Sequence, residues 1–263
     1  MTCGYLACDP GHTLPGNVKT YNAPTMKSPY GLQVIEDCIA CPMLKDRVFC
    51  NLPAPALAGL DAISSTATYP KGAILFVEGQ KPRGVFILCK GRVKLFGSSA
   101  SGKSVIFRIA DSGEIIGLPS TLSAKPFELT AEALEPTQAN FIRSEDFLLF
   151  LREHGDAALR VAEMLSNIYY ATCREVRYLG LAQSTEEKLA RFLLDLKPAN
   201  SSKGAQAKVI LTLTQEEIAN MIGTSRETVS RVLAAFKRRR WIEMQGSTIT
   251  ISRKECLQEL VKI

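Results

Sequence analysis

Three cysteines in the N-terminal part of the chain have the residue type and spacing for metal chemistry. Cys38 and Cys41 are separated by two residues, and Cys50 follows after eight more. Thiolates at such spacing suit soft metal centres. Zinc with a further protein ligand, a thiol redox switch, and thiols without any chemistry are open alternatives. The other five cysteines are Cys89, Cys173 and Cys256, in apolar or helical patterns typical of small core or surface residues, and Cys3 and Cys8.

A second set of candidate residues lies near the C-terminus and predicts a helix-turn-helix. Thr214-Gln-Glu-Glu217 has the form of a capping box that begins a helix, and Gly223 suits its end. Another helical pattern runs from Arg226 to about Arg239. Two short helices joined by a tight glycine-containing turn form a helix-turn-helix. Residues 241–244 and 247–251 alternate around a Gln-Gly pair, which is typical of a two-stranded wing.

The second of these helices carries side chains that suit base reading in a major groove. Arginine can bond bidentately to guanine, and glutamate can accept from cytosine. Residues 208–263 hold ten Lys or Arg and six Asp or Glu, so this segment carries four of the six net positive charges of the chain. Such an excess favours an anionic partner, although a solvated basic face would look the same. The exposed side of the helix presents Arg226, Glu227, Ser230 and Arg231, and Lys237 begins a basic cluster at its end.

Gly97 to Ser104 fits the P-loop pattern, which predicts phosphate binding and gives an alternative function of another class, a P-loop nucleotide hydrolase. A P-loop passes directly into a helix, whose N-terminus meets the phosphates. The residues that follow, Val105 to Ile109, are β-branched or aromatic and predict a strand. We therefore interpret the segment as a hairpin tip. His12 and His154 lie near no evident nucleophile, and we expect the protein not to be an enzyme.

The elements that must position these residues follow a simple order along the chain. Residues 66 to 143 contain short β-rich runs separated by glycine turns, which favours a β-barrel or β-sandwich. From Ser144 the pattern is helical, and a long helix is expected from about Asp156 to Gly180, with an apolar stripe that packs on its own domain or on a twin helix. The predicted regions are a mobile N-terminal tail (1–36), a cysteine-containing segment with a β-domain (37–143), a long-helix region (144–183) and a C-terminal domain (184–263).

The chain shows no sign of a membrane protein or of a secreted one. No apolar run approaches the roughly 20 residues that span a bilayer. The first residues contain no basic region followed by an apolar stretch, so we see no secretory signal and expect a cytoplasmic protein. In a reducing cytosol the eight cysteines are not expected to form a disulfide framework.

The sequence resembles the family of the cyclic-AMP receptor protein and the fumarate–nitrate regulator (CRP/FNR) over about residues 37–263. The stretch LTLTQEEIANMIGTSRETVSRVLAAFKRRRWIEMQGSTITI resembles the helix-turn-helix of this family. KGAILFVEGQ, GVFILCKGRVKLF and GEIIGL resemble its sensor domain. The resemblance implies an α+β fold with an N-terminal β-roll (a jelly roll like that of cyclic-nucleotide-binding domains), a long dimerisation helix, and a C-terminal winged helix-turn-helix.

The resemblance also implies a function, partners and contact residues. The protein would be a transcription regulator, an activator or a repressor, that binds a near-palindromic double-stranded DNA operator as a homodimer. RNA polymerase would be a partner, and loops on the β-roll can touch it in this family. Bases would be contacted by Arg226, Glu227, Ser230 and Arg231. Thr214 and Gln215 would contact the DNA backbone, and Ser225 and Lys237 complete the predicted DNA-binding set.

Members of the family that bind cyclic nucleotides carry a Gly-Glu segment and then an Arg-Ser pair that holds the phosphate. Gly113 and Glu114 match the first segment and are candidates for an effector pocket. Phe127 and Glu128 occupy the position of the Arg-Ser pair, and a carboxylate repels a phosphate. We therefore do not expect cyclic AMP to bind. A regulator of the same fold that is controlled by a cyclic nucleotide or another small ligand in the β-roll is the alternative.

Cys38, Cys41 and Cys50 resemble the N-terminal cluster of the fumarate–nitrate regulator, in which four cysteines hold an oxygen-labile [4Fe–4S] cluster. The resemblance implies control by redox state or oxygen. The gap before the third cysteine is longer here, and the fourth ligand of that regulator, which would fall near Asn140, is missing. Cys89, Cys8 or Cys3 could take its place, if the fold brings one of them near.

Overall fold

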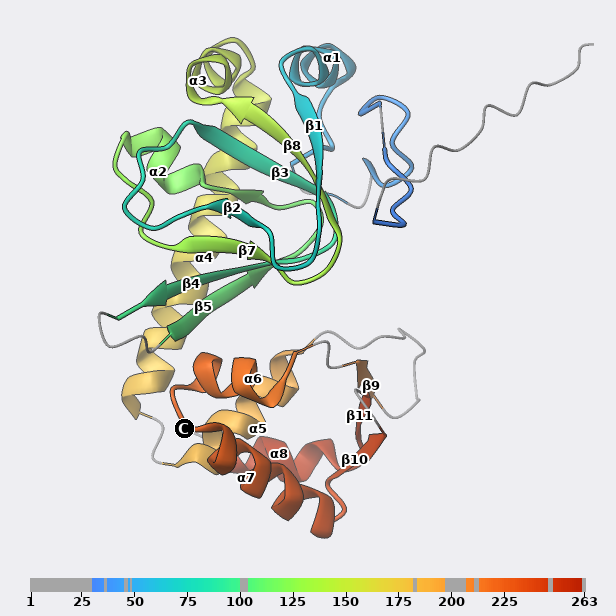
Figure 1. Cartoon of the computed structure of the whole chain (residues 1–263), viewed down its shortest axis with the longest axis vertical. Helices are drawn as coiled ribbons and strands as arrows, with labels where there is room; N and C mark the ends of the chain where they lie inside the picture. The colour runs from blue at the N-terminus through green and yellow to red at the C-terminus, as the bar shows by residue number, and fades with distance from the viewer. Residues whose placement is uncertain are drawn as a thin grey trace, which may run out of the picture.

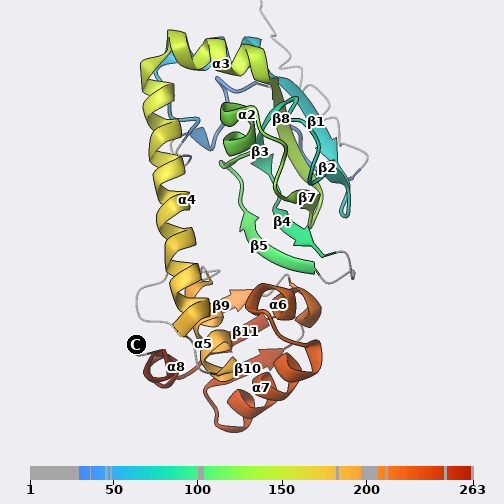
Figure 2. The same ribbon diagram turned by 90° about the vertical axis from the view of Figure 1, so that its left-hand side faces the viewer.

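The computed structural model describes residues 30–35, 37–44, 47, 49–99, 104–181, 184–196, 207–210, 213–245 and 248–261. Most of the predicted tail, with Cys3 and Cys8, lies outside these residues. The last part of it is held against the sheet, because the Ile35 N–H donates to Gln138 Oε1 (2.8 Å) and Gln138 Nε2 donates to the Ile35 carbonyl (2.6 Å). Figures 1 and 2 show a β-rich region at one end, a small helical domain at the other, and one long helix along both.

The β-rich region consists of two four-stranded antiparallel sheets, and together they form the predicted β-roll. The first sheet has the order β1-β8-β3-β6, with bounds Ser65–Tyr69, Thr137–Arg143, Gly84–Lys90 and Ile115–Ile116. The second has the order β2-β7-β4-β5, with bounds Ile74–Phe76, Thr130–Ala133, Val93–Ser98 and Ser104–Ala110. A short helix, α2 (Leu118–Ser123), follows β6.

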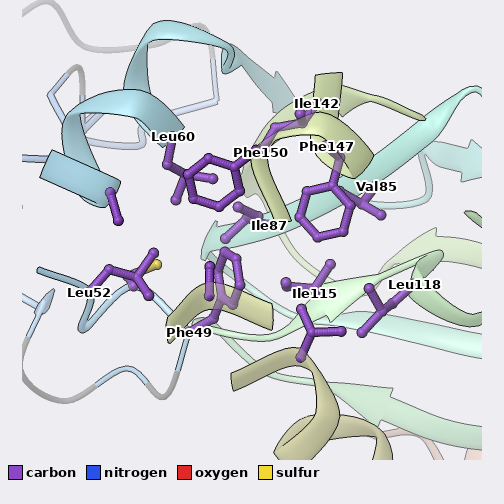
Figure 3. Packing of buried hydrophobic residues seen from close by; sticks show 14 of the residues in the cluster. Phe49, Leu52, Leu60, Val85, Ile87, Ile115, Leu118, Ile142, Phe147 and Phe150 are labelled. Atoms are coloured by element: carbon purple, nitrogen blue, oxygen red, sulfur yellow. The ribbon is translucent and has the colours of Figure 1, made fainter. Parts of the chain in front are cut away.

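Strand β3 is buried on both faces, and this burial explains its almost continuous apolar sequence GVFILCK. Phe86 and Leu88 face the interior of the roll, where they pack with residues of both sheets. Val85 and Ile87 face the other way, into a cluster built with α1 (Ala54–Ala62) and α3 (Ser144–Glu153). Figure 3 shows this outer cluster, in which aromatic rings of α3 lie over β3. Because successive side chains of β3 point to opposite faces, this strand packs both on the roll interior and on helices α1 and α3.

The long helix α4 (Gly155–Leu181) confirms the long helix expected from the sequence. Near its start, Ala157, Val161 and Met164 are buried in the outer cluster beside β3. Figure 2 shows that α4 runs past the roll to the helical domain. The helix thus connects the two ends of the molecule through one rigid element.

The C-terminal domain confirms the winged helix-turn-helix and extends the wing by one strand. Strands β10 (Ile242–Gln245) and β11 (Thr248–Ile251) form the predicted pair. β9 (Ala207–Ile210) adds a third strand, because it pairs antiparallel with β11. Apolar side chains from its helices and strands meet in a separate core. The helices are α5 (Thr185–Asp195), α6 (Gln215–Ile222), α7 (Arg226–Arg238) and α8 (Lys254–Leu260).

The segment that fits the P-loop pattern lies in a hairpin between two strands. β4 and β5 are antiparallel, and Ser98 pairs with Ser104 where β5 begins. Because a strand follows the glycine-rich segment, no helix N-terminus is placed to meet a phosphate there. The hairpin interpretation is confirmed, and the P-loop hydrolase loses its structural basis. Among the described residues, no helix is both long enough and apolar enough to cross a bilayer.

Candidate DNA interface and cysteine cluster

The first helix of the helix-turn-helix begins with the predicted capping box. The Thr214 hydroxyl accepts from the Glu217 N–H (3.2 Å), and the Glu217 carboxylate accepts from the Thr214 N–H (2.8 Å). Gly223 ends the helix with φ +68°, in the left-handed region that glycine adopts readily. Thr214 is exposed and Gln215 is half-buried at this helix start. Both residues lie where the sequence places contacts to the DNA backbone.

The second helix, α7, has a buried face and an exposed face of opposite character. Ser225 caps it by accepting from the Thr228 N–H (3.3 Å), so this hydroxyl serves the turn as well as any DNA contact. The buried face consists of Val229, Val232, Leu233 and Phe236. The exposed face contains Arg226, Glu227, Ser230 and Arg231, all of them open to solvent. The structure therefore brings the four predicted base-reading residues together on one surface.

The carboxylate on this surface is held in its charged form. Hydrogen bonds from its own backbone N–H and from the Ser225 hydroxyl lower the pKa of Glu227, and the Arg226 guanidinium lowers it further. A charged glutamate next to arginines can accept a hydrogen bond from a base while the arginines donate. The exposed face of α7 is thus a mixed donor and acceptor surface, as sequence-specific reading requires.

Some residues of the basic cluster at the end of α7 make contacts within the domain, and others point to solvent. The Trp241 N–H donates to the Phe236 carbonyl and the Arg240 N–H to the Lys237 carbonyl, both at 3.0 Å, which is the Schellman pattern of a helix end. Arg239 pairs with Glu186 of α5 (3.2 Å) and lies over the Trp241 ring. Lys237 is exposed in the last turn of α7.

A contact between the roll and the DNA-binding domain has no local signal in the sequence. Lys94 of β4 pairs with Glu132 of β7 (3.0 Å) and reaches Glu217 of α6 (3.9 Å). Glu217 is the capping residue that holds Thr214, and α6 packs along β5. The roll therefore touches the helix-turn-helix at the cap of its first helix.

The two residues predicted for an effector pocket are both taken up by contacts within the protein. Gly113 has φ +95°, and a Cβ at this position would lie 3.0 Å from Cγ of Arg47. Glu114 pairs with Arg108 and accepts from the Asp111 N–H (2.8 Å). Neither side of this turn presents a free group toward a ligand.

The position that the resemblance assigns to the cyclic phosphate, Phe127, is part of the roll core. Phe127 is buried, and its ring stacks on Phe76 with centroids 4.0 Å apart and planes 18° apart. Phe76 in turn contacts Phe86 of β3. An aromatic core at this place offers no cation for a phosphate.

Cys38 lies against the strand that carries Asn140, the position of the missing fourth ligand. Asn140 Nδ2 donates to Cys38 Sγ at 3.2 Å, and the Cys38 N–H donates to Asp61 Oδ1 at 3.1 Å. Burial raises the pKa of the Cys38 thiol to about 12, with help from the neighbouring Asp61. Cys38 thus lies beside Asn140, the position at which the resemblance would place the fourth ligand.

Four cysteines gather in this part of the structure. The Cys38 thiol lies close enough to Cys50 and Cys89 for their charges to raise its pKa, and Cys41 acts in the same way on Cys50 and Cys89. Cys50 and Cys89 are buried, whereas Cys38 and Cys41 are half-buried. In the described part of the chain, no three Cys, His, Asp or Glu side chains already converge as a metal site. The thiols are neighbours, and coordination would require them to close further.

Two family models match the two ends of this arrangement. The cyclic nucleotide-binding domain matches residues 66–154, which form the roll and α3. The Crp-like helix-turn-helix domain matches residues 187–260. The chain belongs to the CRP/FNR family. Members of the CRP/FNR family are DNA-binding transcription regulators, and this chain is one of them.

Other members of the CRP/FNR family match along most of their length. A CRP-like cAMP-activated global transcriptional regulator of Mycobacterium tuberculosis is 25% identical over 211 residues, which cover 80% of this chain and 94% of the relative. The transcriptional activator protein Anr of Pseudomonas protegens is 29% identical over 188 residues, covering 69% and 74%. The chain is therefore similar both to a cAMP-activated regulator and to the activator Anr.

Solved structures of the CRP/FNR family show the same fold. FixK2 from Bradyrhizobium japonicum superposes with a TM-score of 0.68 at 20% identity, covering 76% of this chain and 98% of that one. A CooA mutant from Carboxydothermus hydrogenoformans gives 0.67 at 23% identity, covering 78% and 90%. The roll, the long helix and the winged helix-turn-helix are therefore the arrangement of the family.

Proposed function

We propose that this CRP/FNR regulator binds a specific DNA operator as a homodimer and that a redox-responsive centre on Cys38, Cys41 and Cys50 supplies its signal. The observation that carries the DNA half is the exposed polar face of α7 over a buried apolar face. The observation that favours a cysteine centre is that Asn140 of β8 donates to Cys38 Sγ, while Cys50 is buried in the outer cluster against which Cys38 packs.

Base reading would come from the α7 surface and positioning from its surroundings. Arg226 and Arg231 would donate to guanine edges, and Glu227 would accept from cytosine. Phosphates would be met by the α6 start at Thr214 and Gln215 and by Lys237. The β4–β5 hairpin is the proposed contact to RNA polymerase, although its tip residues 100–103 lie outside the described part of the chain.

The homodimer would form along α4. In the single chain, this helix exposes several large apolar side chains that gather within about a third of its circumference. Exposed rows of this kind mark interaction surfaces, and a twin helix is the partner that a near-palindromic operator requires. The residues are Leu159 (61% exposed), Tyr169 (66%), Tyr170 (72%) and Val176 (65%), with the exposed Cys173 among them.

The signal centre would be a [4Fe–4S] cluster. Three cysteines offer thiols, which such clusters bind as thiolates, in a site that is partly withdrawn from water. A bound cluster supplies reversible electron transfer and sensitivity to oxygen. The alternative, a cyclic nucleotide in the roll, is disfavoured because Phe127 and Phe76 fill the phosphate position and Arg108 occupies Glu114.

One preparation tests both halves. The protein is purified without oxygen, and its iron, sulfide, visible spectrum and sedimentation are measured, followed by its affinity for a duplex selected from a random pool by the wild-type protein. We expect a dimer, about four irons per chain, and bleaching in air. A colourless protein that takes up no iron on reconstitution refutes the cluster, and a monomer on the selected duplex refutes the homodimer.

A further inference from the structure

We propose that Cys89 supplies the fourth thiolate of this centre and that the buried guanidinium of Arg47 serves as its counter-charge. This inference rests on the proposed redox-responsive centre on Cys38, Cys41 and Cys50. It assigns the fourth ligand, which the resemblance left open. It replaces a ligand on β8, at Asn140, by one from the adjacent strand β3.

The register of the sheet places Cys89 beside Asn140. Ile87 pairs with Asn140 and Leu88 with Ala139, but the register shifts before Lys90 pairs with Gln138. Cys89 is the extra residue in this irregularity, and such bulges redirect a side chain out of the normal alternation. The Asn140 side-chain amide donates to Cys38 Sγ at 3.2 Å, and the backbone N–H of Asn140 is among the groups that lower the pKa of the Cys89 thiol. Asn140 therefore lies next to both cysteines, beside Cys38 by its side chain and beside Cys89 by the strand pairing.

The surroundings of Cys89 differ from those of an ordinary core cysteine. Its side chain is only 6% exposed, yet it belongs to neither the outer cluster nor the roll interior. Its thiol makes a long hydrogen bond, 3.8 Å, to the Ile87 carbonyl. A buried thiol outside the apolar clusters, on the strand paired with the Asn140 that donates to Cys38, is available as a ligand.

Arg47 puts a positive charge at the same place. It is 6% exposed, donates to the Cys89 carbonyl, and its charge acts on the thiols of Cys50 and Cys89. Its Nε is buried without a hydrogen-bond partner among the described residues. A buried cation is costly unless an anion accompanies it. Metal-bound thiolates provide that anion, since they stay deprotonated in the bound state.

Gly113 makes the room that Arg47 needs. A Cβ on Gly113 would lie 3.0, 3.3 and 3.5 Å from the Cγ, Cβ and Cδ atoms of Arg47. The glycine that the resemblance assigned to an effector pocket thus packs against the arginine beneath the cysteines. The turn after β5 is thereby part of the wall of the cysteine site.

Metal binding must draw the half-buried pair toward the buried pair. Cys38 and Cys41 lie in a turn closed by a Cys41 N–H to Cys38 carbonyl bond of 3.3 Å, while Cys50 and Cys89 are fixed in buried positions. We infer that the turn moves and that β3 stays. Cys89 would then be the ligand that ties the cluster to the sheet.

The test compares Cys89→Ser with Cys256→Ser, which removes a half-buried cysteine of α8 in the other domain. Each full-length protein is reconstituted anaerobically with ferrous iron and sulfide and then desalted. We expect about four irons per chain in wild type and in Cys256→Ser, and at least a tenfold faster loss of the visible absorption in air for Cys89→Ser. Far-UV circular dichroism of the apo proteins shows whether each variant is folded.

A second pair of variants addresses Arg47. Arg47→Lys keeps the charge and Arg47→Met removes it. We expect the reduction potential of the reconstituted cluster to shift to more negative values in Arg47→Met and to return toward wild type in Arg47→Lys, because a nearby cation favours the added electron. Equal potentials in all three proteins overturn the role of Arg47.

The outcomes separate the two proposals. A Cys89→Ser protein with the same iron content, spectrum and air stability as wild type overturns the Cys89 assignment and leaves the cysteine input standing. A wild-type protein that takes up neither iron nor zinc overturns both. If the wild type takes up no iron but binds cobalt(II) with a four-thiolate visible spectrum that Cys89→Ser loses, the assignment of Cys89 is supported and the iron–sulfur centre is refuted.

Discussion

Replacement of Arg231 by alanine tests the placement of the reading helix. Arg231 lies on the exposed face of α7, and it makes no ion pair in the part of the chain that the structure describes. Its loss should therefore leave the fold and the dimer intact, with a stability change within about 0.5 kcal/mol. The guanidinium N–H groups of Arg231 are available to donate to a base edge, so removal of this side chain should change DNA binding alone.

The size of the effect follows from the number of subunits. A bidentate arginine–guanine pair contributes about 1–3 kcal/mol of discrimination. A homodimer on a near-palindromic operator loses two such pairs, or about 2–6 kcal/mol. At about 1.4 kcal/mol per tenfold, the affinity should fall by roughly 30-fold at least and up to about 10⁴-fold. Binding to unrelated DNA should change far less, because phosphate contacts dominate it.

The assay is fluorescence anisotropy with the selected operator and with a scrambled duplex at one salt concentration. Arg152→Ala is the matched control, since it removes the same charge from an exposed arginine on α3, in the other domain. We expect Arg152→Ala to stay within a few-fold of wild type. An Arg231→Ala protein that keeps wild-type affinity for the operator refutes the orientation given to α7.

Four further predictions follow from single contacts. Thr214→Ala should remove the capping box and lower the free energy of unfolding by about 1 kcal/mol, as urea denaturation measures. Gly84→Ala should yield insoluble or unfolded protein, because its Cβ would lie 1.9 Å from the Ile142 carbonyl oxygen; soluble protein with a wild-type melting temperature contradicts the β3–β8 pairing. Tyr170→Glu should place a charge on the exposed face of α4 and raise the dimer dissociation constant at least tenfold by sedimentation, whereas an unchanged dimer excludes this face. Burial raises the pKa of Cys50 from 9.0 to about 11. Between pH 9 and 11 the unfolded chain releases this proton while the folded chain keeps it, so the reduced, metal-free protein should lose stability over this range. Parallel urea titrations should show a smaller loss for Cys50→Ser.

The DNA-binding domain could be predicted from the sequence because its signals are local. The cap at Thr214, the turn glycine Gly223 and the apolar spacing of α7 each act within a few residues. The third strand of the wing, β9, was not predicted, because a run of four residues is recognised as a strand only from its pairing with β11. The existence of a roll followed from short strands and glycine turns, but the pairing of β1 with β8, about 70 residues later, did not.

The cysteine site shows where local signals end. The spacing of Cys38, Cys41 and Cys50 marked the site, but Cys89 looked like an ordinary core residue of an apolar strand. Its proximity depends on a bulge and on contacts between segments 40 to 100 residues apart. Arg47 carried no signal at all, because an arginine in a loop is usually exposed. The interpretation of Gly113 as part of an effector pocket came from a family motif and stays a prediction, whereas its packing against Arg47 had no signal in the sequence.

The contact between Lys94 and Glu217 offers a physical link between the two ends of the molecule. Glu217, the capping residue of α6, contacts both Thr214 of its own helix and Lys94 of a strand of the roll. The proposed signal centre lies against β3 and β8 of the same roll, and we propose that it acts on the helix-turn-helix through this contact. Such coupling requires only that the centre bind one arrangement better than the other.

The central claim is that loss of the cysteine-bound centre changes operator binding. The decisive measurement is a single anaerobic sample of reconstituted protein, titrated with the selected operator before and after air exposure while its visible absorption is followed. We predict a change in operator affinity of about tenfold or more that keeps pace with bleaching, within the usual 1–3 kcal/mol of allosteric coupling. An affinity that stays constant while the absorption disappears would contradict the account.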